Sequence, residues 1–170
     1  MITTFKELRY YLVADAIMSR TQATFIQRLF HNNKRSKFLR TLRIVEWLHN
    51  TYKKPFHWWK LLPLCYYSNK LDRLSYQCGF NIPLNTLGYG VNIPHHGSIT
   101  INPHTRLGNY CAIMNNVVIG DSGQKNIGNG VLIGSNTVIL KDICIANGCQ
   151  IAAMSLINKS IDKSNSLWGG

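Results

Sequence analysis

The stretch from Ile127 to Ile151 reads IGNGVLIGSNTVILKDICIANGCQI, with an isoleucine at every sixth position. The same register extends upstream, often with glycine next in sequence, and its members are Leu87, Ile93, Ile99, Leu107, Ile113, Ile119, Ile127, Ile133, Ile139, Ile145 and Ile151. A period of six fits neither an amphipathic helix near 3.6 nor an alternating strand at two. It predicts a mainly β chain folded as a parallel β-helix, in which short strands alternate with corners taken by glycine or asparagine.

The first interruption of this register is an eight-residue step from Ile99 to Leu107, directly after a segment that contains His95 and His96. A histidine at such a corner is a candidate general base, because the unperturbed pKa of an imidazole, about 6.5, is readily tuned. A surface turn residue is the alternative for His95. His96 and His104 have ordinary turn surroundings.

The second interruption is an eight-residue step from Ile119 to Ile127, which predicts a loop over residues 120–126 at another corner. More than one coil of sequence separates the two interruptions. We therefore expect the two loops to lie near each other on one edge or across a subunit boundary.

The chain divides into an N-terminal helical module over residues 1–79 and a β-helix domain over residues 80–170. No linker rich in glycine or serine separates them, so we expect them to pack as one unit. The predicted helices cover residues 3–20, 24–30, 36–50 and 68–77.

Two of these helices have a clear pattern. Thr4 and Glu7 form a capping-box sequence at the start of the first. The residues expected to face the core are Phe5, Leu8, Leu12 and either Ala16 or Ile17 in the first helix, and Phe38, Leu42, Val45 and Leu48 in the third.

Positive charge is concentrated in the first 80 residues, which hold 14 lysines and arginines against 4 acids. No nucleic-acid-binding signature accompanies this charge, so no nucleic-acid partner is predicted. A solvated basic face is the simplest interpretation, and an anionic membrane surface or substrate is the alternative. Residues 53–63 mix aromatics with lysines; we expect packing between helices, with peripheral contact to lipid headgroups as the alternative.

The composition favours a cytoplasmic protein. The N-terminus lacks a secretory pattern, and no apolar run is long enough to span a membrane. Five cysteines without a Cys-x-x-Cys pair are typical of reduced structural thiols. Cys144 and Cys149 lack a companion histidine, so no metal site is predicted.

The stretch GVNIPHHGSITINPHTRLG, from Gly90 to Gly108, resembles the hexapeptide-repeat acyltransferases. Within that family it is similar to the serine acetyltransferases and their polysaccharide O-acetyltransferase relatives. Leu42–Leu48 resembles a helix of the same family, and Asn158–Ile161 resembles the segment after its last coil.

The resemblance implies a left-handed β-helix, a homotrimer, and acetyl-coenzyme A (acetyl-CoA) bound in the groove between neighbouring coils. It implies that His95 removes the proton from an acceptor hydroxyl during direct acyl transfer, with backbone amides near the corner holding the oxyanion. It also implies that Gly120, Ser135 and Ala153 approach coenzyme A, although a simple turn role also explains such small residues.

Three departures from the serine acetyltransferase pattern bear on the substrate. Pro94 stands where those enzymes carry aspartate before the base, and Gln124 stands in a shorter loop where they carry a second histidine. In those enzymes a carboxylate one coil earlier orients the base, but around Phe80 and Asn81 this chain has none. The uncharged side-chain amide of Asn81 is the group expected to hydrogen-bond the imidazole instead. The chain also ends at Gly170, without the Pro-Ala motif of those relatives.

These features predict an acetyl-CoA-dependent O-acetyltransferase for a sugar hydroxyl in cell-surface polysaccharide biosynthesis, acting in the cytoplasm or at the inner membrane surface. A small-molecule or glycan acceptor is therefore expected. A serine O-acetyltransferase and a non-catalytic trimeric scaffold are the alternatives. A β-helical carbonic anhydrase is disfavoured, because His95, His96 and His104 lack the spacing of its zinc ligands.

Overall fold

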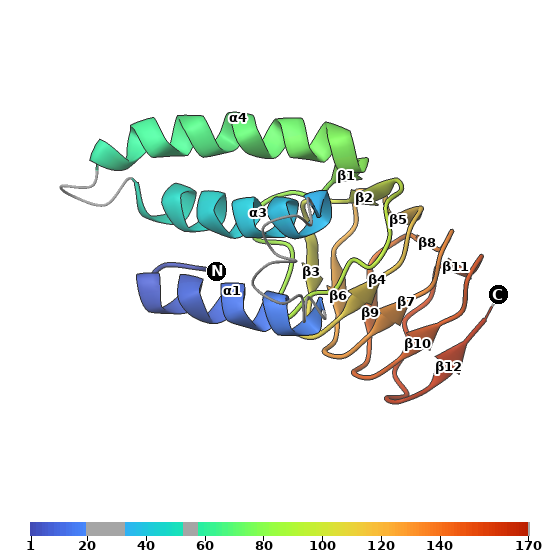
Figure 1. Cartoon of the computed structure of the whole chain (residues 1–170). Helices are drawn as coiled ribbons and strands as arrows, with labels where there is room; N and C mark the ends of the chain where they lie inside the picture. The colour runs from blue at the N-terminus through green and yellow to red at the C-terminus, as the bar shows by residue number, and fades with distance from the viewer. Residues whose placement is uncertain (20–32, 53–57, 170) are drawn as a thin grey trace.

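Three long helices lie at one end of a parallel β-helix in the computed structural model of the chain (Figure 1). The structure describes residues 1–19, 33–52 and 58–169. The helices are α1 (Phe5–Met18), α3 (Lys34–Thr51) and α4 (Leu61–Cys78), and a short 3-10 helix, η1 (Trp58–Lys60), directly precedes α4. The helix predicted over residues 24–30 lies outside the described residues.

Helix α4 begins seven residues earlier than predicted. Pro63 does not interrupt this helix, because it is the third residue of α4, where a backbone N–H has no partner within the helix. The end of α4 agrees with the prediction: Gly79 takes a left-handed conformation (φ 76°), and its amide donates to the carbonyl of Ser75 at 2.9 Å.

Helix α1 begins with the predicted capping box, since the Glu7 amide donates to Thr4 Oγ1 at 3.1 Å and the Thr4 amide to the Glu7 carboxylate at 2.9 Å. These bonds and those from Thr3 lower the pKa of Glu7 to about 2. The predicted apolar stripe is wrong in part: Leu8 is buried, but Phe5 and Ile17 are 61% and 70% exposed. The helix instead turns Asp15 toward the interior, where its carboxylate pairs with Arg43.

The β-helix is built from three sheets of short parallel strands. The first sheet contains β1 (Phe80–Asn81), β2 (Ile99–Ile101), β5 (Val117–Ile119), β8 (Val138–Ile139) and β11 (Leu156–Ile157). The second contains β4 (Ala112–Ile113), β7 (Leu132–Ile133), β10 (Gln150–Ile151) and β12 (Leu167–Trp168), and the third β3 (Thr105–Leu107), β6 (Lys125–Ile127) and β9 (Ile143–Ile145).

The six-residue register forms the interior of this β-helix, as predicted. All eleven of its members are buried, none more than 5% exposed. Members stack on one another between coils: Leu107 pairs with Ile127, and Ile127 with Ile145. The buried core is continuous from Phe38 in α3 to Ile161, so the helices and the β-helix share one interior.

The first interruption of the register lies earlier in the chain than the sequence predicted. Ile99 and Ile101 are both buried, and Ile101, six residues before Leu107, is the one that pairs with Ile119. The two extra residues therefore lie before Ile99, in the corner formed by residues 94–98. This corner contains His95.

The second interruption lies where it was predicted, between Ile119 and Ile127. Its loop leaves from the far end of the first-sheet strands, whereas residues 94–98 lead into them. Within one chain the two loops therefore occupy different corners, and the expectation of a shared edge is wrong.

Arg43 of α3 joins the helices to the first coil. Its guanidinium is fully buried and donates to Asp15 Oδ2 at 2.9 Å, to Glu46 Oε2 at 3.0 Å and to the Leu87 carbonyl at 3.0 Å, and also to the Gly88 carbonyl. The two carboxylates in turn accept backbone amides of the coil: Val91 donates to Asp15 at 3.0 Å and Asn85 to Glu46 at 2.7 Å.

Burial alone would lower the pKa of Arg43, but the carboxylates of Glu46 and Asp15 outweigh it and raise that pKa above its ordinary value. The guanidinium and both carboxyl groups are thus buried, and each has hydrogen-bond partners. Asp15 faces inward because this group needs it, which explains why Phe5 and Ile17 face solvent.

We predict that Arg43→Ala lowers the free energy of unfolding by about 3–5 kcal/mol, because it leaves two buried carboxylates without their cation. Urea denaturation followed by circular dichroism measures this. Arg40→Ala, on the exposed side of the same helix, is the matched control and should change stability by less than about 0.5 kcal/mol. Equal effects of the two substitutions would contradict the account.

Candidate active site at the His95 corner

The corner that carries His95 connects Ile93 with strand β2. The side chains of His95 and His96 are both exposed there. Pro94 precedes them and fixes its own φ, so the corner enters the turn in a restricted conformation. His95 thus stands on an enlarged corner of an otherwise regular coil.

The coil below supports this corner through asparagine side chains. The Ser98 amide donates to Asn116 Oδ1 at 3.2 Å, and Asn116 Nδ2 donates to Asn136 Oδ1, one coil further, at 3.1 Å. Asn116 and Asn136 both have positive φ, 58° and 59°, a conformation that asparagine tolerates better than most residues. Gly97 lies so close that a Cβ there would be 2.9 Å from that of Asn115.

Several hydrogen-bonding groups at the His95 corner have no partner among the described residues. Within the described part of the chain, no hydrogen bond engages the His95 imidazole or the backbone amides of His96 and Gly97. An imidazole and two amide donors are therefore grouped on one exposed turn. This arrangement suits a site that receives both a proton and a developing negative charge.

Asn81 lies on β1, in register with Thr100 of β2, and its side chain is exposed. It lines an open cavity of about 790 Å³ between α4 and the first coil, together with Ser98 and Thr100. Among the described contacts, none joins Asn81 to His95. Its role in orienting the base stays a prediction.

Two of the three residues predicted to approach coenzyme A share the His95 corner. Ser135 lies one coil beyond Asn115, to which its hydroxyl donates at 2.9 Å. Ala153 follows in the next coil, where the neighbouring Met154 amide donates to the Ser135 carbonyl at 2.8 Å. Ser135 and Ala153 therefore continue the same edge of the β-helix away from His95.

Gly120 lies at the other end of the first-sheet strands, after β5. The fold does not require glycine here, because a Cβ would meet only side-chain atoms, Val118 Cγ1 at 3.3 Å and Leu140 Cδ2 at 3.6 Å. At Gly134, by contrast, a Cβ would be 2.5 Å from the Ala153 backbone nitrogen. Close packing against the next coil thus requires glycine at position 134 but not at position 120.

The loop after Gly120 is held by its own hydrogen bonds. The ammonium group of Lys125, a fully buried residue, donates to the carbonyls of Gly123 at 2.8 Å and Asp121 at 3.3 Å. Backbone amides of Ser122 and Lys141 bond the Asp121 carboxylate and lower its pKa.

Two polar residues from the sequence analysis face the space beside this loop. His104 and Gln124 both line an open cavity of about 420 Å³. The His104 amide donates to Asn102 Oδ1 at 2.7 Å, as expected for a turn residue. His104 and Gln124 therefore lie at a different corner of the β-helix from His95.

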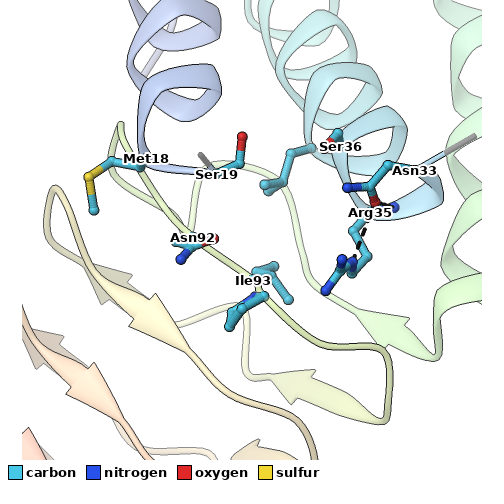
Figure 2. Close-up of a pocket in the computed structure, with 9 residues that line it drawn as sticks. Met18, Ser19, Asn33, Arg35, Ser36, Asn92 and Ile93 are labelled. Atoms are coloured by element: carbon cyan, nitrogen blue, oxygen red, sulfur yellow. Dashed lines mark hydrogen bonds between the residues drawn. The ribbon is translucent and has the colours of Figure 1, made fainter. Parts of the chain in front are cut away.

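A smaller cavity next to Pro94 was not predicted. It measures about 210 Å³ and lies where the end of α1, the start of α3 and the Asn92–Pro94 segment meet (Figure 2). Arg35 extends into this region from the first turn of α3, with its Nε 3.4 Å from Asn33 Oδ1 (Figure 2). Among the described residues that line the cavity there is no acid, and Arg35 gives this lining a positive character.

The sequence offered only a weak signal for this cavity, because Arg35 belongs to a basic run that is typical of a solvated helix face. Among the described residues, no group of three histidines, cysteines or acids is placed to hold a metal ion. No described helix is long and apolar enough to cross a membrane.

Comparison with known proteins agrees with this architecture. Residues 125–159 match the family described as bacterial transferase hexapeptide (six repeats). Serine acetyltransferase 4 of Arabidopsis thaliana is 31% identical over 117 residues, which is 65% of this chain and 32% of that protein. WcaB of Escherichia coli K12, named as an acetyltransferase of colanic acid biosynthesis, is 32% identical over 99 residues, 54% of this chain and 61% of WcaB.

Solved serine acetyltransferases share the whole fold. Isoform 3 of Entamoeba histolytica, in complex with cysteine, superposes with a TM-score of 0.71 at 18% identity, over 98% of this chain and 59% of the other. The Neisseria gonorrhoeae enzyme, in complex with serine, gives 0.67 at 26% identity, over 94% and 66%.

The chain is therefore similar to hexapeptide-repeat transferases, and the relatives that it matches include serine acetyltransferases and WcaB. It spans about a third of the length of the first Arabidopsis relatives that it matches.

Proposed function

We propose that this protein is an acetyl-CoA-dependent O-acetyltransferase that acts on a sugar hydroxyl in cell-surface polysaccharide biosynthesis. The observation that carries the proposal is the His95 corner, where an exposed imidazole without a described partner stands beside the free amides of His96 and Gly97. The similarity to acetyltransferases of both serine and colanic acid supports this class of reaction.

In the proposed reaction the neutral imidazole of His95 takes the proton of the acceptor hydroxyl while its oxygen attacks the thioester carbonyl. The carbonyl oxygen becomes negatively charged, and the amides of His96 and Gly97 are the nearest backbone donors in the sequence to stabilise it. Breaking of the carbon–sulfur bond releases coenzyme A, whose thiolate recovers the proton from His95. No covalent enzyme intermediate is needed.

The surroundings of His95 favour an acceptor other than free serine. An ammonium group needs a negative partner, and Pro94 places no carboxylate next to the base. The described lining of the adjacent cavity presents the Arg35 cation and no acid, which suits an acceptor that carries a carboxylate or phosphate. A charged sugar or sugar nucleotide has this chemistry.

Ser135 and Ala153 give coenzyme A a path along the edge that continues from His95, and Gly120 marks a second approach at the far end of the strands. The strand between these corners is only three residues long, about 10 Å at the usual rise. An extended cofactor reaches across that distance. Asn81 remains the proposed, uncharged partner of the base.

We place the reaction in the cytoplasm and propose a homotrimer. The His95 corner and the loop with Gln124 lie on different corners of one chain, so a neighbouring copy is needed to bring such surfaces together. Serine O-acetylation remains the second candidate, because serine acetyltransferases are among the relatives. A trimeric scaffold without catalysis is the third, since no described carboxylate contacts His95.

We predict that His95→Ala lowers acetyl-CoA-dependent thiol release by at least about 100-fold, because a general base contributes roughly 10²–10⁴ to such a rate. A thiol-reactive chromophore follows the reaction with a panel of sugar and sugar-nucleotide acceptors. His96→Ala, next in sequence and equally exposed, is the control and should keep the rate. Equal loss in both variants would remove the proposed base, and no thiol release with any acceptor would favour the scaffold.

We predict that Gly120→Ala weakens coenzyme A binding by about tenfold, a change of about 1.4 kcal/mol, while the melting temperature stays that of the wild type. The added methyl group fits the fold but occupies the surface that the cofactor would approach. Calorimetric titration with coenzyme A measures the affinity. Gly134→Ala should instead lower the melting temperature, and unchanged affinity in Gly120→Ala would show that this surface does not face the cofactor.

A further inference from the structure

The start of α4 exposes a group of large apolar side chains, which we call the apolar tip. It consists of Trp58, Trp59, Leu61, Leu62 and Tyr66, and these residues are 80%, 54%, 51%, 80% and 64% exposed. Residues 53–63 were expected to pack between helices. Residues 53–57 lie outside the described part of the chain, and for Trp58, Trp59, Leu61 and Leu62 the expectation is wrong.

A buried lysine underlies the tip. Lys60 lies between the exposed rings and is only 4% exposed; its Nζ donates to Thr51 Oγ1 at 2.9 Å and lies 4.2 Å from the centre of the Trp47 ring. It also lies 5.5 Å from the Trp59 ring. The usual preference for lysine outside and tryptophan inside is reversed at this position, which points to a surface that meets something other than water.

The position of the tip leaves it accessible to a large flat partner. It lies at the end of α4 farthest from the β-helix, and the C-terminal coil lies at the opposite end of the molecule (Figure 1). A planar surface therefore reaches the tip without meeting the β-helix. Pro94, next to His95, lies where α1 and α3 meet the β-helix, away from the tip.

The charge of the helical module indicates the sign of the surface that the tip would bind. Of its four acids, Asp15 and Glu46 are buried against Arg43, so only Glu7 and Asp72 remain exposed. The cations exposed in the described helices are Lys6, Arg9, Lys34, Lys37, Arg40, Lys70 and Arg73. Lys34, Lys37 and Arg40 belong to the first part of α3, which lies next to the β-helix, whereas the end of α3 contacts the tip through Thr51 and Lys60. Nearer the tip, Lys6 and Arg9 at the start of α1 and Lys70 of α4 outnumber the exposed acid Glu7, so this part of the surface is basic and complementary to an anionic one.

We propose that the apolar tip docks on an anionic lipid bilayer. Tryptophan and tyrosine rings favour the headgroup region, leucine side chains reach the acyl boundary, and basic residues are attracted to an anionic surface. The docking surface rests on the helical module alone and does not require the proposed reaction. It would bring that reaction to lipid-linked glycans, which are themselves anionic.

Sedimentation with vesicles tests the proposal on the full chain without acetyl-CoA. We expect binding to vesicles that contain phosphatidylglycerol, little binding to pure phosphatidylcholine, and weaker binding as salt screens the charges. The double variant Trp58→Ser, Leu62→Ser should lower the partition coefficient by about tenfold or more, since it removes two apolar anchors. Tyr76→Ser is the matched control, because Tyr76 is 89% exposed on the same helix but next to the β-helix.

Two outcomes would overturn the proposal. The first is wild-type chain that stays in solution with anionic vesicles, or a double variant with a native circular dichroism spectrum that binds as well as wild type. The second is a double variant that changes the sedimentation mass in solution but not vesicle binding, which would assign the tip to an interface between copies. Neither outcome bears on thiol release, so failure of docking and failure of the proposed function are distinguishable.

Discussion

The buried guanidinium of Arg43 is the contact on which the arrangement of the whole molecule depends. The first coil of a β-helix has no coil above it, so some of its backbone groups would lack partners. Arg43 donates hydrogen bonds to the Leu87 and Gly88 carbonyls. The carboxylates of Asp15 and Glu46 accept hydrogen bonds from the Val91 and Asn85 amides, respectively. The helical module is thus the cap of the β-helix. The same burial removes two carboxylates from its surface and leaves that surface basic.

The interior of the β-helix was predictable because every coil repeats the same steric requirement, and all members of the register are buried. The position of the first interruption was not, since Ile99 and Ile101 are both inward and a count along the sequence cannot choose between them. Hydropathy likewise placed Phe5 and Trp58 inside. Asp15 faces inward on α1 while Phe5 faces solvent, and Lys60 occupies the interior against Trp47 while Trp58 is exposed.

The candidate site combines one predicted residue with surroundings that only the fold assembles. His95 was identified from its motif, but the free amides beside it and the Arg35 cavity depend on how the corner meets α1 and α3. Ser135 and Ala153 fall on the same edge because corners repeat with each coil, whereas Gly120 belongs to another corner. The substitution of proline for aspartate before the base and the presence of Arg35 change the local charge in the same direction. Both favour an anionic acceptor over an ammonium-bearing one.

The central claim is that this corner transfers acetyl groups to a sugar and not to serine. The most direct measurement offers both acceptors together, with equal concentrations of L-serine and a mixture of uronic acids and sugar nucleotides, and identifies the acetylated product by mass spectrometry after limited reaction with labelled acetyl-CoA. The account predicts label on a charged sugar and little on serine. O-acetylserine as the main product would contradict it.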